Sequence, residues 1–252
     1  MTIFASDLDN TLIYSYKHDI GMRKRNVEIY QSREISFVTD RTHSLLEKVK
    51  EKSIFVPVTT RSIEQYKRID FGIEKIKYAL TCNGGVLLVD GEKDSDWYEE
   101  SKRIAEQSLC ELQKGISILE KDANRKFEIR FIENLFVFTK CENPSETVEN
   151  LKSQLDCTLA EVFSNGEKIY ILPKKLDKGS AVKRFKEKMN AKKIISAGDS
   201  EFDIPMLEAS DIALIPSDFH WQLNDSSPRI LKNDDKMIFS DFILENVLKA
   251  LE

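Results

Sequence analysis

Two aspartates near the start of the chain, Asp7 and Asp9, follow a short apolar segment in the sequence IFASDLDNTL. Alternate residues of an extended strand point to the same side, so both carboxylates would face the same way at a strand end. Like charges this close raise each other's pKa unless a cation compensates them. Because a polar turn explains the pair on its own equally well, its meaning depends on the rest of the chain.

Polar side chains also follow other candidate strands. They occur in VTTR (residues 58–61), in TCNGG (81–85) and in GDSEFD (198–203), and a lysine stands in LDKGSAVKRF (176–185). Ligands of open parallel sheets bind at the carboxyl ends of the strands, so these segments would meet at one edge. The predicted site residues are Asp7, Asp9, Thr59, Thr60, Arg61, Asn83, Lys178, Asp199 and Asp203.

Most of these residues also have an ordinary structural explanation. Threonine is common in strands, Asn83 suits a turn, and Asp203, two residues before Pro205, suits a helix N-cap. Lys178 is harder to explain, because a cation in the first turn of a helix opposes the helix dipole by about 0.3–1 kcal/mol. A phosphate bound at that helix end would compensate it.

Four carboxylates collect at the predicted sheet edge, from Asp7, Asp9, Asp199 and Asp203. Only three histidines exist in the chain, and none lies next to one of the four cysteines. Oxygen ligands without histidine or cysteine indicate Mg²⁺, which binds through one or two carboxylates, water and substrate phosphate. Together with threonine and lysine, the acidic cluster describes a phosphoryl-transfer site.

The elements that would position this site alternate between strands and helices. The predicted strands, which are nearly continuous apolar runs, cover residues 3–6, 54–59, 78–82, 193–197 and 212–215. Such runs are typical of parallel strands that are buried on both faces. We therefore expect an α/β fold, a Rossmann-like doubly wound parallel sheet with helices on both faces.

Residues 84–173 show a different pattern and predict an inserted α/β domain with an antiparallel sheet. Its expected helices cover 97–119 and 145–155, and its expected strands cover 127–132, 135–140, 158–163 and 168–172. The core domain would consist of residues 1–83 and 174–252. A long connection at about 13–41, with a hairpin of 27–30 and 35–39, would form a flap near the site, since long loops at strand ends commonly carry function.

Composition favours a soluble protein with a small-molecule ligand. The 252 residues carry a net charge of −5 with no long block of one sign, which argues against a nucleic-acid partner. No apolar run approaches the ~18 residues that span a bilayer. We expect a cytoplasmic protein, a monomer or homodimer, with no membrane partner and with separate reduced cysteines.

The order DLDNT, VTTR, DKG and GDSEFD resembles the four motifs of haloacid dehalogenase superfamily phosphatases. The insertion looks like the type C2B cap of subclass IIB, which includes Cof-like sugar phosphatases, sucrose-phosphate phosphatase and phosphomannomutase. Each motif alone is weakly specific, whereas four in order at strand ends are strongly specific. Thr60 and Phe202 depart from this branch, which usually has glycine and asparagine there.

The resemblance implies a Mg²⁺-dependent phosphatase of a small phosphorylated metabolite, with a sugar phosphate as the expected substrate. Asp7 would be the nucleophile and form an aspartyl phosphate, and Asp9 would be the general acid and base. Thr59 and Lys178 would hold phosphoryl oxygens.

The resemblance also implies the ligands of the metal and of the substrate. Mg²⁺ would be held by Asp7, the backbone carbonyl of Asp9, Asp199 and Asp203, the last behind or beside Asp199. The substrate-binding positions would be Thr60, Arg61 and Asn83. Two alternatives are a phosphomutase of the phosphomannomutase kind and a non-catalytic binding or regulatory module on the same fold.

Overall fold

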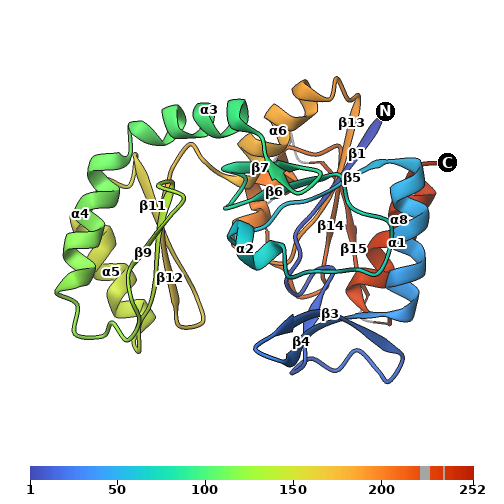
Figure 1. The fold of residues 1–252 in the computed structure, drawn as a ribbon, viewed down its shortest axis with the longest axis horizontal. Coiled ribbons are helices and arrows are strands. Elements are labelled where there is room, and N and C mark those ends of the chain that lie inside the picture. The colour runs from blue at the N-terminus through green and yellow to red at the C-terminus, as the bar shows by residue number, and fades with distance from the viewer. Residues whose placement is uncertain (222–227, 235) are drawn as a thin grey trace. The chain divides into compact units, whose positions relative to one another are not determined.

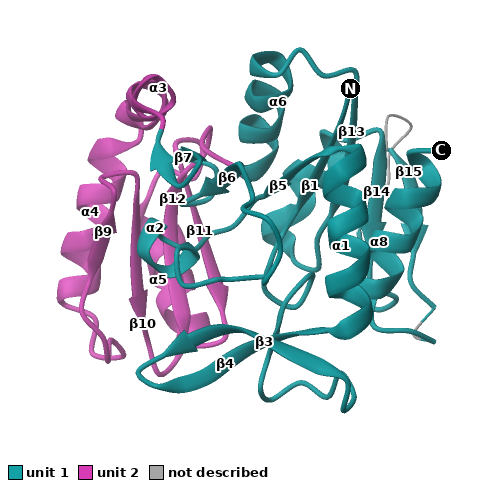
Figure 2. Ribbon diagram, turned by 45° about the vertical axis from the view of Figure 1, so that its right-hand side comes forward, with its two compact units in different colours: residues 1–93, 178–252 teal, residues 94–177 magenta. Residues whose placement is uncertain are grey.

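The computed structural model describes residues 1–221, 228–234 and 236–252 and divides into two compact units (Figure 2). The first unit contains Met1–Lys93 and Lys178–Glu252, and the second contains Asp94–Asp177. The second unit thus begins at residue 94, whereas the sequence places the boundary at 84. The difference arises because residues 86–93 pair with the strand before them in the first unit.

A five-stranded parallel sheet forms the centre of the first unit and confirms the predicted α/β fold class. Its strands lie in the order β15-β14-β13-β1-β5, so β1 has a neighbour on each side. Their bounds are β1 Thr2–Ser6, β5 Ile54–Pro57, β13 Lys193–Ala197, β14 Ile212–Ile215 and β15 Arg229–Lys232. Most residues of β1, β5, β13 and β14 are buried, as expected for strands covered on both faces.

The prediction that residues 78–82 form a strand of the parallel sheet is wrong. This segment is β6, which pairs antiparallel with β7 in a separate three-stranded sheet. It meets the residues that follow β5 through a parallel bridge between Val58 and Leu80 and a hydrogen bond from the N–H of Thr59 to the carbonyl of Leu80. Positive φ angles at Cys82, Asn83 and Gly84 turn the chain straight back on itself. The strands are β6 Tyr78–Thr81, β7 Val86–Val89 and β8 Glu92–Lys93.

Helices cover both faces of the parallel sheet in the first unit (Figure 1). Helices α1 and α8 contact each other on one face, and α6 and α7 contact each other on the opposite face. The helices are α1 Asp40–Lys52, α2 Ile63–Tyr66, α6 Lys178–Lys188, η1 Glu201–Asp203, α7 Ile204–Glu208 and α8 Phe239–Ala250. Within the described residues, no helix has the length and apolar character that crossing a bilayer requires.

The predicted flap is a three-stranded sheet in the order β2-β4-β3. Its strands are β2 Tyr14–Ser15, β3 Lys24–Tyr30 and β4 Arg33–Thr39, so the expected hairpin is confirmed with longer strands. Gln31 and Ser32 both have positive φ, as a two-residue hairpin turn requires. The pairing of β3 with β4 is irregular around Glu28, where a β-bulge shifts the register.

The second unit is a four-stranded antiparallel sheet in the order β11-β12-β10-β9 with three helices. Helices α4 and α5 pack on this sheet around buried residues such as Leu112, Leu151 and Ile171. The single helix predicted over 97–119 is two helices, which are separated at Gln107 and Ser108. The bounds are α3 Ser95–Glu106, α4 Leu109–Glu120, β9 Arg130–Ile132, β10 Phe136–Lys140, α5 Pro144–Gln154, β11 Ala160–Asn165 and β12 Lys168–Pro173.

Two glycines of the first unit allow close backbone approaches. A Cβ on Gly179 would lie 2.1 Å from the carbonyl oxygen of Pro205, so α6 can pack on α7 at this point only without a side chain. A Cβ on Gly198 would lie 2.3 Å from the Cβ of Asp203. Both glycines belong to the sequence motifs and have ordinary negative or extended φ, so contact rather than backbone conformation requires them.

We predict that Gly179→Ala lowers the free energy of unfolding by about 1–3 kcal/mol, because the added methyl group overpacks a backbone contact. Lys183→Ala on the exposed side of the same helix is the matched control and should change it by less than about 0.5 kcal/mol. Urea unfolding measures both. Equal free energies of unfolding for the two variants would contradict the proposed close contact of Gly179 with Pro205.

Candidate active site

The Lys178 ammonium group bridges two carboxylates in the interior of the first unit. Its Nζ atom donates to Asp7 Oδ1 and to Asp203 Oδ1, each at 2.6 Å. Lys178 is only 1% exposed, and Asp203 is fully buried. Although burial alone would lower the pKa of Lys178, the carboxylates of Asp203 and Asp7 raise it, so the ammonium stays charged.

These contacts also account for a lysine in the first turn of α6. The sequence suggested a bound phosphate as compensation for its unfavourable position at the helix N-terminus. In the structure, Asp7 and Asp203 supply negative charge at that position through the two ion pairs. The three residues therefore form one buried charge cluster that joins the end of β1, the start of α6 and the end of η1.

Asp203 also fixes the loop that carries Asp199. Its Oδ2 atom accepts hydrogen bonds from the backbone N–H of Asp199 at 3.1 Å and from the N–H and hydroxyl of Ser200 at 3.0 and 2.9 Å. Asp203 stands at the N-cap position of α7, but its side chain makes no N-cap hydrogen bond to that helix. Its carboxylate instead holds the loop after β13.

Asp199 faces the same cluster and is held by Thr11. The hydroxyl of Thr11 donates to Asp199 Oδ1 at 2.8 Å. Thr11 lies in a tight loop after β1, in which the carbonyl of Leu8 accepts from the N–H groups of Thr11, Leu12 and Ile13. The loop therefore positions both Asp7 and the residue that orients Asp199.

Three carboxylates have the donor chemistry and the proximity of a hard-cation site. Oxygen atoms of Asp7, Asp199 and Asp203 all lie within 4.8 Å of one another. Burial, with repulsion from neighbouring carboxylates, raises the pKa of Asp7 well above its usual range, although Lys178 opposes the shift. Burial and the Asp203 carboxylate raise the pKa of Asp199 to about 6. Lys178 supplies one positive charge for three carboxyl groups, so excess negative charge remains. These residues therefore fit a divalent cation such as Mg²⁺.

The predicted residues Thr59 and Asn83 lie next to each other. Thr59 is buried directly after β5, and its hydroxyl accepts from the N–H of Arg61 at 3.1 Å. The N–H of Asn83 donates to the carbonyl of Thr59 at 2.9 Å, and that of Cys82 donates to the carbonyl of Arg61 at 2.8 Å. Thr60, which lies between Thr59 and Arg61 in the sequence, is half-buried. The turn after β6 is therefore hydrogen-bonded to the VTTR segment, residues 58–61.

Asp9 belongs to a different set of contacts from Asp7. Arg61 binds both of its oxygens, through Nε at 2.8 Å and Nη2 at 2.6 Å. The chain has left β1 at Ser6, so the expected alternation of a strand does not extend to Asp9, whose side chain is 51% exposed. The predicted substrate-binding role of Arg61 stays a prediction.

Sequence reasoning missed Glu28 and Arg68, which extend this second set. Arg61 Nη1 lies 2.9 Å from Glu28 Oε2, and Arg68 Nε lies 3.1 Å from Glu28 Oε1. In a regular strand Glu28 would face away from the buried Val27, and only the bulge in β3 brings both side chains inside. The sequence carries no clear signal for that bulge.

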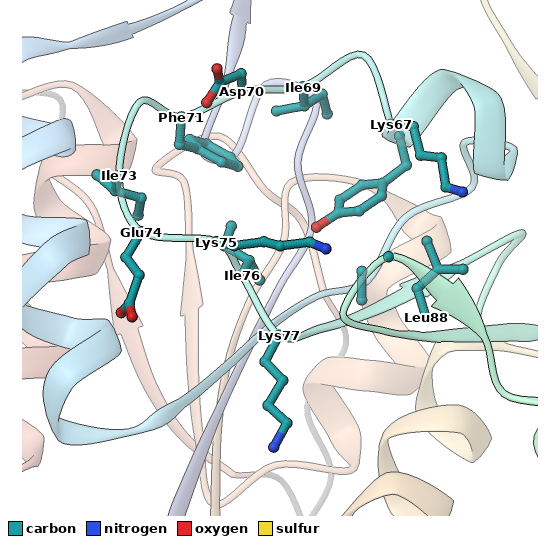
Figure 3. A pocket seen from close by; sticks show the side chains of 13 residues that line it. Lys67, Ile69, Asp70, Phe71, Ile73, Glu74, Lys75, Ile76, Lys77 and Leu88 are labelled. Atoms are coloured by element: carbon teal, nitrogen blue, oxygen red, sulfur yellow. The ribbon is translucent and has the colours of Figure 1, made fainter.

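A separate cavity of about 270 Å³ contains none of the predicted site residues. It is lined mainly by the connection between α2 and β6, including Ile69, Phe71 and Lys75, together with Leu88 (Figure 3). The Lys75 ammonium donates to the backbone carbonyl of Asp90. This cavity is therefore distinct from the acidic cluster.

We predict that, in the metal-free protein, the stability of Asp199→Asn relative to wild type is greater at neutral pH than at acidic pH. The pKa of Asp199 is about 6 in the folded state against an ordinary 3.8, so folding favours its protonated form. The contribution of this group to the unfolding free energy falls as pH rises from about 4 to about 6. The asparagine does not ionise, so its stability relative to wild type should rise by about 1–3 kcal/mol across that window.

Urea unfolding in EDTA at pH 4.5 and pH 7.5 measures this difference. Asp218→Asn, at an exposed carboxylate of the same unit, is the control and should show the same difference from wild type at both pH values. A difference between Asp199→Asn and wild type that does not change with pH would rule out the proposed linkage.

Comparison with known proteins identifies the family. The model of the haloacid dehalogenase-like hydrolases matches residues 89–236, more than half of the chain. Phosphoglycolate phosphatase 2 of Saccharolobus solfataricus is 27% identical over 237 residues, which are 87% of this chain and 94% of that protein. Phosphoglycolate phosphatase of Methanopyrus kandleri is 24% identical over 178 residues, which are 68% and 73% of the two chains.

The solved structures agree in fold. The sucrose-phosphatase of Synechocystis, in complex with sucrose and phosphate, has a TM-score of 0.66 at 17% identity and covers 98% of this chain and 96% of that chain. The likeness therefore includes the second unit, as the expected subclass IIB fold requires. From its residues 89–236 and the fold of the whole, the chain belongs to the haloacid dehalogenase-like hydrolases.

Proposed function

We propose that this protein is a Mg²⁺-dependent phosphatase that hydrolyses a small phosphorylated metabolite, of the sugar-phosphate class, through an aspartyl phosphate on Asp7. The observation that carries the proposal is the buried Asp7, which lies against the Lys178 ammonium group and beside Asp199 and Asp203. Relatives named phosphoglycolate phosphatase support a small phosphorylated substrate, and a sucrose-phosphatase of the same fold supports the sugar-phosphate class. The second unit would correspond to the inserted cap that the family resemblance implies.

In the proposed first step, a carboxylate oxygen of Asp7 attacks phosphorus, and the bond from phosphorus to the ester oxygen breaks. Asp9 gives its proton to the departing alcohol. In the second step, water attacks the phosphorus of the aspartyl phosphate while Asp9 takes a proton from that water. The bond from phosphorus to Asp7 breaks, which releases phosphate and restores the Asp7 carboxylate.

Lys178 and Thr59 have the positions that phosphoryl recognition needs. The Lys178 ammonium contacts Asp7 directly, so a phosphoryl group attached to Asp7 would remain next to a fixed positive charge. Thr59 is buried at the end of the neighbouring strand β5 and offers a hydroxyl group. Preorganised donors of this kind are the main catalytic resource in phosphoryl transfer.

The carboxylates of Asp7 and Asp199, with the backbone carbonyl of Asp9, would hold Mg²⁺. The bound ion supplies neutralisation of the charge on the phosphoryl oxygens. Asp203 uses Oδ1 for Lys178 and Oδ2 for the backbone of residues 199 and 200, which favours a position behind Asp199 rather than beside it. Asp203 would then orient the metal ligands through their loop.

A phosphate-release screen tests the proposal. The panel contains phosphorylated sugars, polyol phosphates, phosphoglycolate and nucleotides, each assayed with Mg²⁺ and with EDTA. We expect release of free phosphate from at least one sugar or polyol phosphate with Mg²⁺, a loss of more than about 100-fold in EDTA, and recovery on adding Mg²⁺. Transfer within the substrate without release would support a phosphomutase, and no reaction at all would support a non-catalytic module.

We predict that Asp7→Asn abolishes phosphate release while the protein stays folded, because an amide cannot form the covalent intermediate. Lys178 keeps its ion pair with Asp203 in this variant. Circular dichroism and urea unfolding monitor the fold, and the best substrate of the panel monitors activity. Retention of more than about 1% of wild-type kcat would refute Asp7 as the nucleophile.

A further inference from the structure

Glu28 is a fully buried carboxylate that lies outside the four sequence motifs. It is in β3 of the flap sheet, and its side chain has no exposed surface. Ser36 donates to Oε2 at 2.6 Å, and the guanidinium groups of Arg61 and Arg68 lie against Oε2 and Oε1. Burial of a carboxylate is unfavourable unless cations and hydrogen bonds compensate it. Two guanidinium groups lie against Glu28, and Ser36 donates to Oε2, whereas Oε1 accepts no hydrogen bond from the described residues. Glu28 therefore does more than fill volume in the core.

Arg61 connects Glu28 to Asp9. Two of its nitrogen atoms bind the two oxygens of Asp9, and the third lies 2.9 Å from Glu28. A guanidinium group is planar and rigid, so contacts along two of its edges determine the orientation of the whole plane. The plane in turn determines the direction of a carboxylate bound through both oxygens. The side chain of Arg61 is mostly buried, which restricts other orientations.

The anchor at Glu28 is itself fixed from several sides. Arg68 stacks on the ring of Tyr30 at 4.4 Å from the ring centroid, and the amide of Asn26 donates to the carbonyl groups of Glu28 and Ser36 at the bulge. The bulge and its neighbours therefore hold Glu28 in place. Asp9, by contrast, is half-exposed, and both of its carboxylate oxygens accept hydrogen bonds from Arg61.

We propose that Glu28 is a positioning residue for proton transfer, which acts through Arg61 to orient the carboxylate of Asp9. The inference rests on the proposed function, in which Asp9 protonates the departing alcohol. It gives the flap sheet a role that the sequence motifs do not contain. Glu28 itself touches neither the substrate nor the transferred proton.

The readout that separates positioning from general structural damage is the dependence on the leaving group. An alkyl alcohol is a poor leaving group and needs its proton from Asp9, whereas p-nitrophenolate departs without one. We expect Glu28→Gln to lower kcat/KM for the best alkyl phosphate of the panel by about 10–100-fold. The decrease for p-nitrophenyl phosphate should be below about 3-fold, because that substrate does not need the oriented acid.

Asp241→Asn is the matched control, since Asp241 is another buried carboxylate of the first unit. Within the described residues, it accepts hydrogen bonds from Thr39 and Thr42, each at 2.6 Å, and these bonds do not involve Arg61 or Asp9. Loss of folded protein lowers kcat/KM for both substrates by the same factor. The ratio of alkyl to aryl kcat/KM should therefore remain at the wild-type value in Asp241→Asn.

Two further variants test the path through Arg61. Adding Glu28→Gln to Arg61→Met should change the alkyl-to-aryl ratio by less than about 2-fold, because the connecting group is already absent. Ser36→Ala removes only one hydrogen bond of Glu28 and should shift the ratio in the same direction by a smaller factor. This variant carries the test if Glu28→Gln does not fold.

The outcomes separate the inference from the proposed function. An active wild-type enzyme whose ratio is unchanged in Glu28→Gln, or in Ser36→Ala where the former does not fold, overturns the inference alone. An additional, independent decrease in the double variant also overturns it. If the wild-type protein releases no phosphate from any compound, the proposed function fails and the role of Glu28 fails with it.

Discussion

The ion pairs of Lys178 with Asp7 and Asp203 are the interaction on which the rest of the core depends. Three carboxylates converge at the carboxyl edge of the parallel sheet, and like charges in a poorly solvated site repel one another strongly. A buried ammonium group between two of them makes the arrangement tolerable. Helix α6 must bring that ammonium to the sheet edge, which explains why its second residue, Gly179, can carry no side chain against Pro205.

Asp7 and Asp9 are two residues apart, yet separate cationic groups compensate them. Asp7 is buried against a lysine that stands on a helix of the second half of the chain. Asp9 is half-exposed and bound by an arginine that follows β5. The loop after β1 makes this division possible, because three N–H groups close on the carbonyl of Leu8 between the two aspartates. Different surroundings therefore give two like side chains different chemical properties.

Much of this arrangement could be predicted from the sequence, for identifiable reasons. The apolar runs of β1, β13 and β14 are long enough to identify buried parallel strands, and strand ends in such sheets share one edge. Asp7, Lys178, Asp199 and Asp203 therefore come together as expected.

Three features could not be predicted in this way. Residues 78–81 look like a parallel strand, but the left-handed turn at Cys82 and Asn83 makes a hairpin. The half-buried strand β15 has no apolar run. The contact of Glu28 with Arg61 needs a bulge that follows from tertiary packing. Periodicity reports local pattern, and these features depend on non-local neighbours.

The position of β1 in the sheet has a consequence for how the chain folds. This first strand lies between β5 and β13, and β13 begins only at residue 193 of 252, so about three quarters of the chain must be synthesised before β1 gains its second neighbour. The second unit, residues 94–177, emerges during that interval and pairs its strands only among themselves. Its sheet can form early, while the acidic residues after β1 await Lys178. High contact order thus makes the completion of the parallel sheet a late event in folding.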